Sequence, residues 1–222
     1  MILSMDTSTL GLSLVLADEK NILAELNLTG DKPCGEKIVE SFDKMLKITG
    51  LASEQLDKII LTTGPGSFTG LRIGMTFAKG LCAVNRIELR GIDTHIPVAW
   101  RLRKVHKTVL ITQDARKGQL YASGYESKGE EVNVLIPLQS WDPRDLISCL
   151  PSCPVSICGT GIRYLKPYLS AREDLIWLDH PWWYSSLAKT LLSLWESEYT
   201  DVLDPTTALP HYFRRSQAET GN

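Results

Sequence analysis

The chain has 222 residues, a formal net charge of −2 at pH 7 and a hydrophobic content of 43%. This length suits one large domain or two small ones, and either can bury a core. The near-neutral charge argues against unaided binding to a nucleic acid, because phosphate neutralisation requires a basic protein face.

The cysteines and the apolar segments indicate a compartment. The five cysteines form no C-x-x-C pair, and they stand at Cys34, Cys82, Cys149, Cys153 and Cys158. An odd number without such pairs, in a chain too long to need disulfides, is typical of reduced cytosolic proteins. We find no secretory signal and no apolar stretch long enough to span a membrane. We therefore expect a soluble, cytoplasmic protein.

The first part of the chain alternates apolar runs with turns. This pattern predicts strands at 2–5, 12–17, 21–28 and 58–63, and helices at 36–48 and 68–84. The same order recurs after Thr94, with strands at 108–112, 119–125, 132–137 and 155–158, and helices at 142–149 and 161–169. A last amphipathic helix is expected at 185–199.

The repeated order predicts an α/β fold made of two duplicated βββαβα halves, each a mixed sheet flanked by helices. Chance similarity between two α/β halves is the alternative. We place the first half at 1–103, where it carries the candidate partner-binding helices, and the second at 104–222. The last helix is a candidate for packing back on the first half.

The helix predicted at 68–84 carries small residues on one face. Gly70, Gly74, Ala78 and Cys82 recur at every fourth position. Each glycine costs roughly 1 kcal/mol of helix stability relative to alanine, so a close contact must compensate for it. Two interpretations remain open: the helix is enclosed within its own domain, or the small face meets a helix of another subunit.

Motifs that would support catalysis or metal binding are not found. The turn GPGSFTG precedes this helix but lacks the G-x-x-x-x-G-K-[ST] pattern of a phosphate-binding loop. The four histidines show no zinc-binding spacing, and no G-x-S-x-G nucleophile motif occurs. We expect Ser67 to cap the helix rather than to act as a nucleophile. The sequence therefore predicts no catalytic residue and no metal ligand.

Two aspartate loops could face a nucleotide. Asp6, Thr7 and Ser8 follow the first strand, and Asp114 ends the equivalent strand of the second half. Ligands of open α/β sheets bind beyond the carboxyl ends of strands, where such side chains could contact phosphate or Mg²⁺. The alternative is that Asp and Thr here only begin turns through hydrogen bonds to the backbone.

Five segments resemble the bacterial TsaB family of the threonylcarbamoyladenosine synthesis system. The matching segments are ILSMDTSTLGLSLVL, GPGSFTGLRIGMTFAKGL, QDARKGQLYASGY, CGTGIRYL and PHYFRRSQAE, which follow one another over nearly the whole chain. This resemblance implies two actin-like (RNase H-like, ASKHA) halves. The chain differs from the family pattern at one point, because Cys34-Gly35 replaces the histidine-serine that usually precedes the first long helix.

The resemblance also implies a role. Such proteins are non-catalytic partners of the catalytic paralogue TsaD, which transfers threonylcarbamoyl to the tRNA adenosine next to the anticodon, and the ATPase TsaE completes the assembly. A homodimer is expected when TsaD is absent. We expect no cofactor on this chain alone, and ATP or ADP with Mg²⁺ at the subunit interface.

The partner surface implied by the resemblance lies on helices 36–48 and 68–84. The residues expected there are Ile38, Phe42, Met45, Gly70, Leu71, Gly74, Met75, Ala78 and Cys82. An ATP-dependent small-molecule kinase of the same superfamily is the competing interpretation, although the chain has little room for an adenosine pocket and a lid. A peptidase would need a metal or nucleophile set that the sequence does not show.

Overall fold

A computed structural model describes residues 1–30, 35–211 and 213, and the chain forms two compact units. The first unit contains residues 1–97 and 185–211, and the second contains 98–184 together with Phe213. The division therefore falls six residues before the expected boundary, and the segment that carries the last helix belongs to the first unit.

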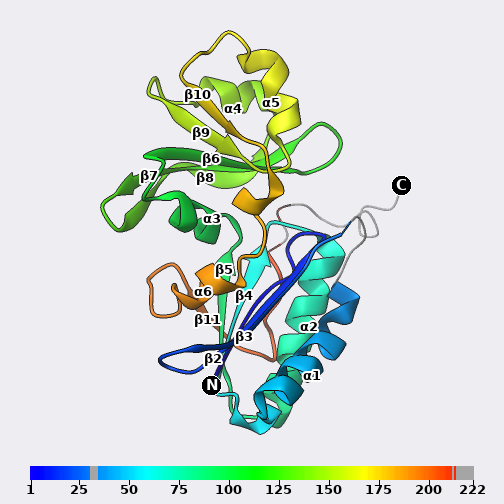
Figure 1. Ribbon diagram of the computed structural model, residues 1–222. Coiled ribbons are helices and arrows are strands. Elements are labelled where there is room, and N and C mark those ends of the chain that lie inside the picture. The colour runs from blue at the N-terminus through cyan, green and yellow to red at the C-terminus, as the bar shows by residue number, and fades with distance from the viewer. Residues whose placement is uncertain (31–34, 212, 214–222) are drawn as a thin grey trace. The chain divides into compact units, whose positions relative to one another are not determined.

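The first unit is built on a mixed sheet with the strand order β11-β5-β4-β1-β2-β3. Its strands are β1 (Ile2–Asp6), β2 (Leu12–Ala17), β3 (Ile22–Leu28), β4 (Lys58–Gly64), β5 (Glu88–Asp93) and β11 (Asp201–Leu203). The β1 strand pairs antiparallel with β2 and parallel with β4, so it occupies the centre of the sheet. Figure 1 shows this sheet with the two long helices beside it.

The second unit repeats this arrangement with the strand order β10-β9-β6-β7-β8. Its strands are β6 (Thr108–Asp114), β7 (Leu120–Lys128), β8 (Glu131–Trp141), β9 (Val155–Cys158) and β10 (Leu175–Leu178). Here β6 pairs antiparallel with β7 and parallel with β9, as β1 does with β2 and β4. The predicted duplicated α/β fold is thus confirmed, and only β11 has no counterpart in the second sheet.

Helices cover both faces of the first sheet. The α1 (Ile38–Thr49) and α2 (Phe68–Val84) helices pack on one face, where their apolar residues and alternate strand residues such as Leu3, Leu14 and Ile59 form one core. The opposite face receives α6 (Ala188–Leu192). Two buried hydrogen bonds fix α6, because Ser4 Oγ donates to the Ala188 carbonyl at 2.6 Å and the Ala188 amide donates to Ser13 Oγ at 3.2 Å.

Helices of the second unit are shorter. They are α4 (Pro143–Ser148) and α5 (Ile162–Leu169), which contact each other and are drawn together in Figure 1. Their buried residues Leu146, Ile162 and Leu165 join the strand residues Leu110 and Ile157 in a second core. The α3 helix (His95–Leu102) spans the point where the chain passes from one unit to the other.

Several elements differ from the sequence prediction. The sequence did not predict the β5, α3, β10 and β11 elements. The β5 strand reads ELRGID and has only two strongly apolar residues. The last helix was expected at 185–199, but regular α-helix covers only Ala188–Leu192. Ser193 Oγ and Ser197 Oγ donate at 2.7 Å to carbonyls three residues earlier, and such local bonds compete with α-helical geometry.

Candidate functional site

The small-residue face of α2 contacts the loop that follows β1. A Cβ atom at Gly70 would overlap the Thr7 carbonyl oxygen, and one at Gly74 would overlap Thr7 Oγ1. Ala78, one turn further on, is fully buried in the same core. The glycines therefore allow α2 to approach its own domain closely, which was the first of the two interpretations of this face. Gly70, Gly74 and Ala78 thus face their own domain.

The remaining residues expected at the partner surface also face inward. Relative exposures are 2% for Ile38, 5% for Phe42 and 3% for each of Met45, Leu71 and Met75. Phe42 packs edge-to-face on Phe77 of α2, with ring centroids 5.5 Å apart. Cys82 is half-buried, and this burial raises the pKa of its thiol. The buried side chains among them hold α1 and α2 against the sheet of their own unit.

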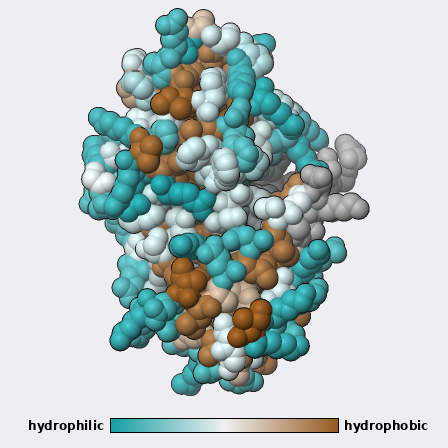
Figure 2. Space-filling view, viewed as in Figure 1, coloured by the Kyte–Doolittle hydropathy of each residue, from teal (hydrophilic) through white to brown (hydrophobic). Residues whose placement is uncertain are grey.

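Other residues of α1 and α2 form the surface that these helices present to solvent. Exposed apolar side chains are Val39 (63%) and Ile48 (84%) on α1, and Phe68 (38%) and Val84 (77%) on α2. Figure 2 shows hydrophobic surface over these helices, interrupted by polar residues. The sequence did contain a signal for two of them, because Val39 and Ile48 depart from the amphipathic pattern of α1.

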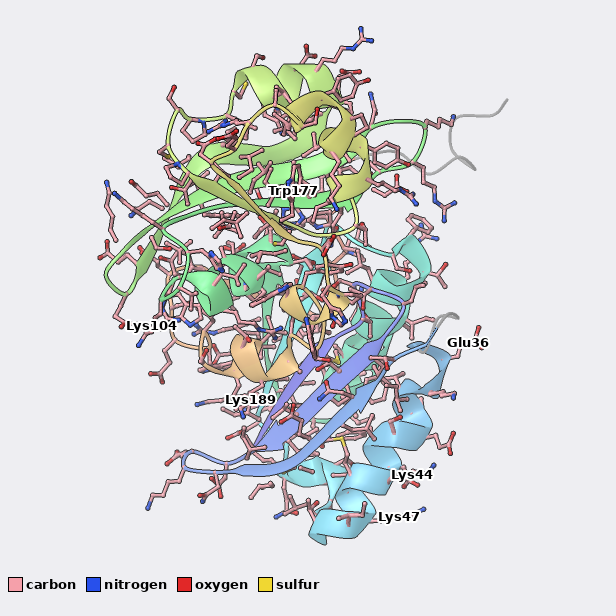
Figure 3. The ribbon with its side chains drawn as sticks, turned by 45° about the horizontal axis from the view of Figure 1, so that its top comes forward. Glu36, Lys44, Lys47, Lys104, Trp177 and Lys189 are labelled. Carbon is pink, nitrogen blue, oxygen red and sulfur yellow. The ribbon has the colours of Figure 1, made fainter. Side chains whose placement is uncertain are left out.

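Beside the exposed Arg72, whose guanidinium lies 3.9 Å from the ring centroid of Phe68, the outer side of α2 carries mostly small residues. Thr69, Thr76, Gly80 and Ala83 are exposed, and a Cβ atom at Gly80 would meet no atom within 4 Å. On α1, Lys44 and Lys47 form exposed ion pairs with Glu40 and Asp43, at 2.5 and 2.6 Å. Figure 3 shows both lysines pointing away from the sheet. We call this surface, made of the exposed residues of α1 and α2 named in these two paragraphs, the outer helix face.

The loop after β1 is a buried structural joint. Asp6, Thr7 and Ser8 have relative exposures of 2%, 3% and 2%. Asp6 Oδ1 accepts hydrogen bonds from Thr62 Oγ1 at 2.8 Å and from the Ser8 amide at 2.9 Å. The Ser8 carbonyl accepts from the Ser67 amide at 2.7 Å, and a Cβ atom at Gly66 would overlap Ser8. The loop thereby connects β1, β4 and the start of α2.

Ser67 caps α2, as the sequence predicts. Its side chain accepts a hydrogen bond from the Gly70 amide at 3.2 Å, which satisfies one of the free amides of the first turn. Sequence reasoning missed the Thr62 hydroxyl as the partner of Asp6, since the two residues are 56 positions apart. Among the described buried hydroxyls, Ser8 Oγ and Thr94 Oγ1 have no hydrogen-bond partner.

Asp114 lies at the end of β6 in the second unit, where its surroundings are more open. Its carboxylate forms an ion pair with Arg163 of α5 and accepts from the Arg116 amide at 2.7 Å. Its own amide donates to Thr160 Oγ1 at 3.0 Å. The Asp114 side chain is 22% exposed and the Arg163 side chain 67%. Both aspartates are thus already bonded within their own units.

A histidine near the end of the first unit adds a polar contact that the sequence did not predict. His211 Nδ1 lies 3.4 Å from Asp93 Oδ1, and the His211 amide donates to the Thr63 carbonyl at 2.8 Å. The hydrogen bond that the imidazole donates to the Asp93 carboxylate raises the pKa of His211 above its ordinary value, while partial burial acts in the opposite direction. Lys79 of α2 donates to the carbonyls of Thr206 and Ala208, so this final segment is tied to α2.

Within the described residues, no group of three or more His, Cys, Asp or Glu side chains is arranged to hold a metal ion. Over the same residues, no helix combines the length and the hydropathy needed to cross a membrane.

Comparison with known proteins identifies the family. Residues 31–152 match the family model described as "TsaD: tRNA N6-adenosine threonylcarbamoyltransferase". The chain belongs to the TsaD family. The matched region is more than half of the chain and includes α1 and α2. Cys34 lies outside the described residues. The same holds for Tyr212 and residues 214–219 of the segment PHYFRRSQAE.

Within the TsaD family, the chain is similar to curated TsaB proteins, so the resemblance read from the sequence is confirmed. It is 30% identical over 139 residues to the "tRNA threonylcarbamoyladenosine biosynthesis protein TsaB" of Bacillus subtilis, covering 63% of this chain and 61% of that protein. It is also 30% identical over 144 residues to the Escherichia coli protein of the same name, covering 61% of this chain and 62% of that protein. The chain thus spans about three fifths of the length of these curated relatives.

Two solved structures show the same fold. The Pseudomonas aeruginosa protein described as "YeaZ" superimposes with a TM-score of 0.72 at 20% identity, covering 95% of this chain and 98% of that one. A second Pseudomonas aeruginosa structure, described as similar to the peptidase YEAZ, gives a TM-score of 0.73 at 21% identity. Both cover almost the whole chain, so the two-unit fold is shared from end to end.

Proposed function

We propose that this chain is a non-catalytic scaffold subunit of the complex that adds threonylcarbamoyl to the tRNA adenosine next to the anticodon. Membership of the TsaD family over residues 31–152 carries the proposal, and the names of the curated TsaB relatives support it. The loop after β1 supports the non-catalytic role. Its buried carboxylate already accepts two hydrogen bonds from the chain itself, and α2 packs closely against it.

The outer helix face is the surface we assign to the catalytic partner TsaD. It combines exposed apolar side chains, such as Val39 and Ile48, with the strip of small residues around Gly80. Such exposed apolar residues are typical of surfaces that bind another protein, and small residues let a second helix approach closely. The same face would form the homodimer when TsaD is absent, because a self-complementary apolar surface favours a two-fold pair.

The ATPase subunit, the cellular location and the nucleotide of the assembly are predicted from the family resemblance. TsaE is the expected ATPase of the complex, the location is expected to be cytoplasmic, and ATP or ADP with Mg²⁺ is expected at the subunit interface. Among the residues named for the nucleotide, Asp114 is the more accessible, since Asp6 is 2% exposed. A nucleotide that binds the complex but not the lone chain would support this assignment.

Affinity purification of the tagged full chain from its native cell tests the proposed partner. We expect recovery of the TsaD paralogue, and we expect tRNA modification only when both proteins are supplied with ATP, threonine and bicarbonate. Ile48→Asp, which places a charge on the outer helix face, should weaken the pairing at least tenfold, or about 1.4 kcal/mol.

Val134→Asp is the matched control, because Val134 is an apolar residue, 60% exposed, on β8 of the other unit. It should pair normally. Modified adenosine formed by the lone chain would contradict the non-catalytic role. Equal pairing by Ile48→Asp and wild type would contradict the assigned face.

A further inference from the structure

A hollow of about 600 Å³ opens on the second unit beside α4 and α5. Its lining includes Asp142, Arg144 and Asp145 from the start of α4, Arg163, Tyr164 and Tyr168 from α5, and Gly118 from the turn between β6 and β7. The volume falls in the range of small-molecule sites, which runs from about 300 to 1,000 Å³. None of the functions assigned above uses this hollow.

Arginine and tyrosine side chains are paired along its wall. The Arg163 guanidinium lies 4.9 Å from the ring centroid of Tyr164, and the Arg144 guanidinium lies 5.9 Å from that of Tyr168. Tyr168 is 53% exposed, so its ring offers an open surface to a ligand. An aromatic ring beside a guanidinium is an arrangement on which a nucleobase can stack.

The charges of the hollow are mixed. Asp142 Oδ1 caps α4 by accepting from the Arg144 amide at 2.9 Å, and Arg163 is paired with Asp114. Across the described residues, neither the Arg144 guanidinium nor the Lys117 ammonium forms an ion pair, and Lys117 adjoins the lining residue Gly118. The exposed Asp145 carboxylate can accept from an N–H donor.

This combination matches the groups of one nucleotide. A base supplies an aromatic face for Tyr168 and N–H donors for Asp145, while a phosphate supplies the negative charge that Arg144 can contact. A purely anionic ligand would meet two carboxylates, and an apolar one would meet four charged side chains. A base within a duplex cannot enter such a hollow, because it is already stacked and paired.

We propose that this hollow binds an unpaired nucleotide of an RNA strand, with the base on Tyr168 and the phosphate at Arg144. The choice of RNA over a free nucleotide rests on the proposed function, since tRNA is the substrate of that reaction. The net charge of −2 implies modest affinity for the lone chain, so the site would add to an RNA grip supplied mainly by partner subunits.

Titration of the full chain with a fluorescently labelled single-stranded RNA of ten nucleotides, at low salt, tests the proposal. Tyr168→Ala should weaken binding roughly fivefold or more through lost base stacking, whereas Tyr168→Phe keeps the ring and should bind normally. Arg144→Ala should weaken binding and lower the slope of log affinity against log salt by about one. A duplex of the same sequence should bind more weakly than the single strand.

Two exposed side chains serve as matched controls. Lys44→Ala changes the charge as Arg144→Ala does, and Trp182→Ala removes a 67% exposed ring elsewhere on the second unit. Both should bind RNA like the wild type. No RNA binding by the wild type, equal losses in the controls and the test variants, or binding of free AMP without binding of RNA would overturn the proposal. A peptide that competes while RNA does not bind would reassign the hollow to a protein ligand.

Co-purification of the same variants with TsaD separates this inference from the proposed function. Tyr168→Ala and Arg144→Ala should pair with TsaD normally, because both residues lie outside α1 and α2. If the wild type fails to pair with TsaD, the proposed function is wrong, while the RNA titration still reports on the hollow. If pairing is normal and the Tyr168→Ala variant binds RNA as tightly as the wild type, the hollow proposal alone is wrong.

Discussion

The two units share one strand order but use it differently. In the first unit, the 17-residue α2 lies so close to the loop after β1 that only glycine fits at two contact positions. In the second, the equivalent α5 has eight residues, contains Pro167, and leaves a hollow beside α4. Duplication therefore conserved the sheets, while the helices diverged into a closely packed layer in one unit and a concave surface in the other.

The aspartate that ends the first strand of each unit shows the same divergence. Asp6 is buried and bonds a hydroxyl of the neighbouring strand, whereas Asp114 pairs with an exposed arginine. Equivalent positions thus form a buried hydrogen-bond network in one unit and a solvent-accessible ion pair in the other. The energies of the two sites should differ accordingly. Of four experiments, one compares the two units directly and three test features of the first unit.

Substitution of a glycine in α2 should have the largest effect. Gly70→Ala places a methyl group on the Thr7 carbonyl and should lower the free energy of unfolding by about 1 to 3 kcal/mol or more, despite a gain of up to about 1 kcal/mol in helix propensity. Gly80→Ala is the control in the same helix, where open space lets the gain appear. Urea unfolding of both variants gives the comparison, and equal stabilities would show that the α2 contact is looser than described.

Removal of each aspartate in turn should show the difference between the two units directly. Asp6→Ala leaves a buried hydroxyl and a buried amide without their partner, and should lower the free energy of unfolding by about 1 to 3 kcal/mol. Asp114→Ala removes an ion pair whose arginine is largely in water and should change it by less than about 1 kcal/mol. A nucleotide role for Asp6 would appear instead as lost nucleotide affinity in the assembled complex.

Bulk on the outer side of α2 should affect association and not folding. Gly80→Leu enters open space in the lone chain but would obstruct a helix packed on the outer helix face, and we expect pairing with TsaD to weaken about tenfold, or 1.4 kcal/mol. Analytical ultracentrifugation with thermal melting measures both properties. A lower melting temperature without a change in pairing would place the partner elsewhere.

The smallest effect should come from His211. Its pKa is raised in the folded chain, first by the hydrogen bond with Asp93 and further by Asp201, so its contribution to stability is complete below the unfolded value near 6.5 and is lost as the pH rises through the folded value. Because the side chain is 49% exposed, the contribution should stay below about 1 kcal/mol. His211→Gln should therefore differ from the wild type at pH 6 more than at pH 9, and Asp93→Asn should reduce this difference.

Sequence reasoning predicted the strands that carry apolar runs, together with both long helices, because periodicity reports burial directly. It missed β5, whose Arg90 and Gly91 interrupt the apolar pattern, and it joined α6 to the serine-rich turns that follow it. At the candidate site, the spacing of Gly70 and Gly74 correctly indicated a close contact. The identity of the contacting residue, Thr7, depends on tertiary packing that helical spacing does not encode.

The inward positions of α1 and α2 illustrate a second limit. Ile38, Phe42 and Met45 have the spacing of a buried stripe, and sequence cannot distinguish a stripe buried by the chain itself from one buried by a partner. The exposed residues Val39 and Ile48 interrupt that spacing and were therefore passed over. For this class of helix, apolar residues outside the amphipathic pattern are better candidates for an interface than those within it.

The order of the chain has a consequence for synthesis on the ribosome. The first unit is completed only by residues 185–211, where α6 bonds to β1 and β2 and where Lys79 holds the segment near Ala208. Residues 98–184, which form nearly all of the second unit, emerge before that closing segment does. During translation, the amino-terminal sheet must therefore wait, with one face uncovered, until a later-made domain has left the exit tunnel, and nascent chains that stall in between would carry that uncovered apolar face.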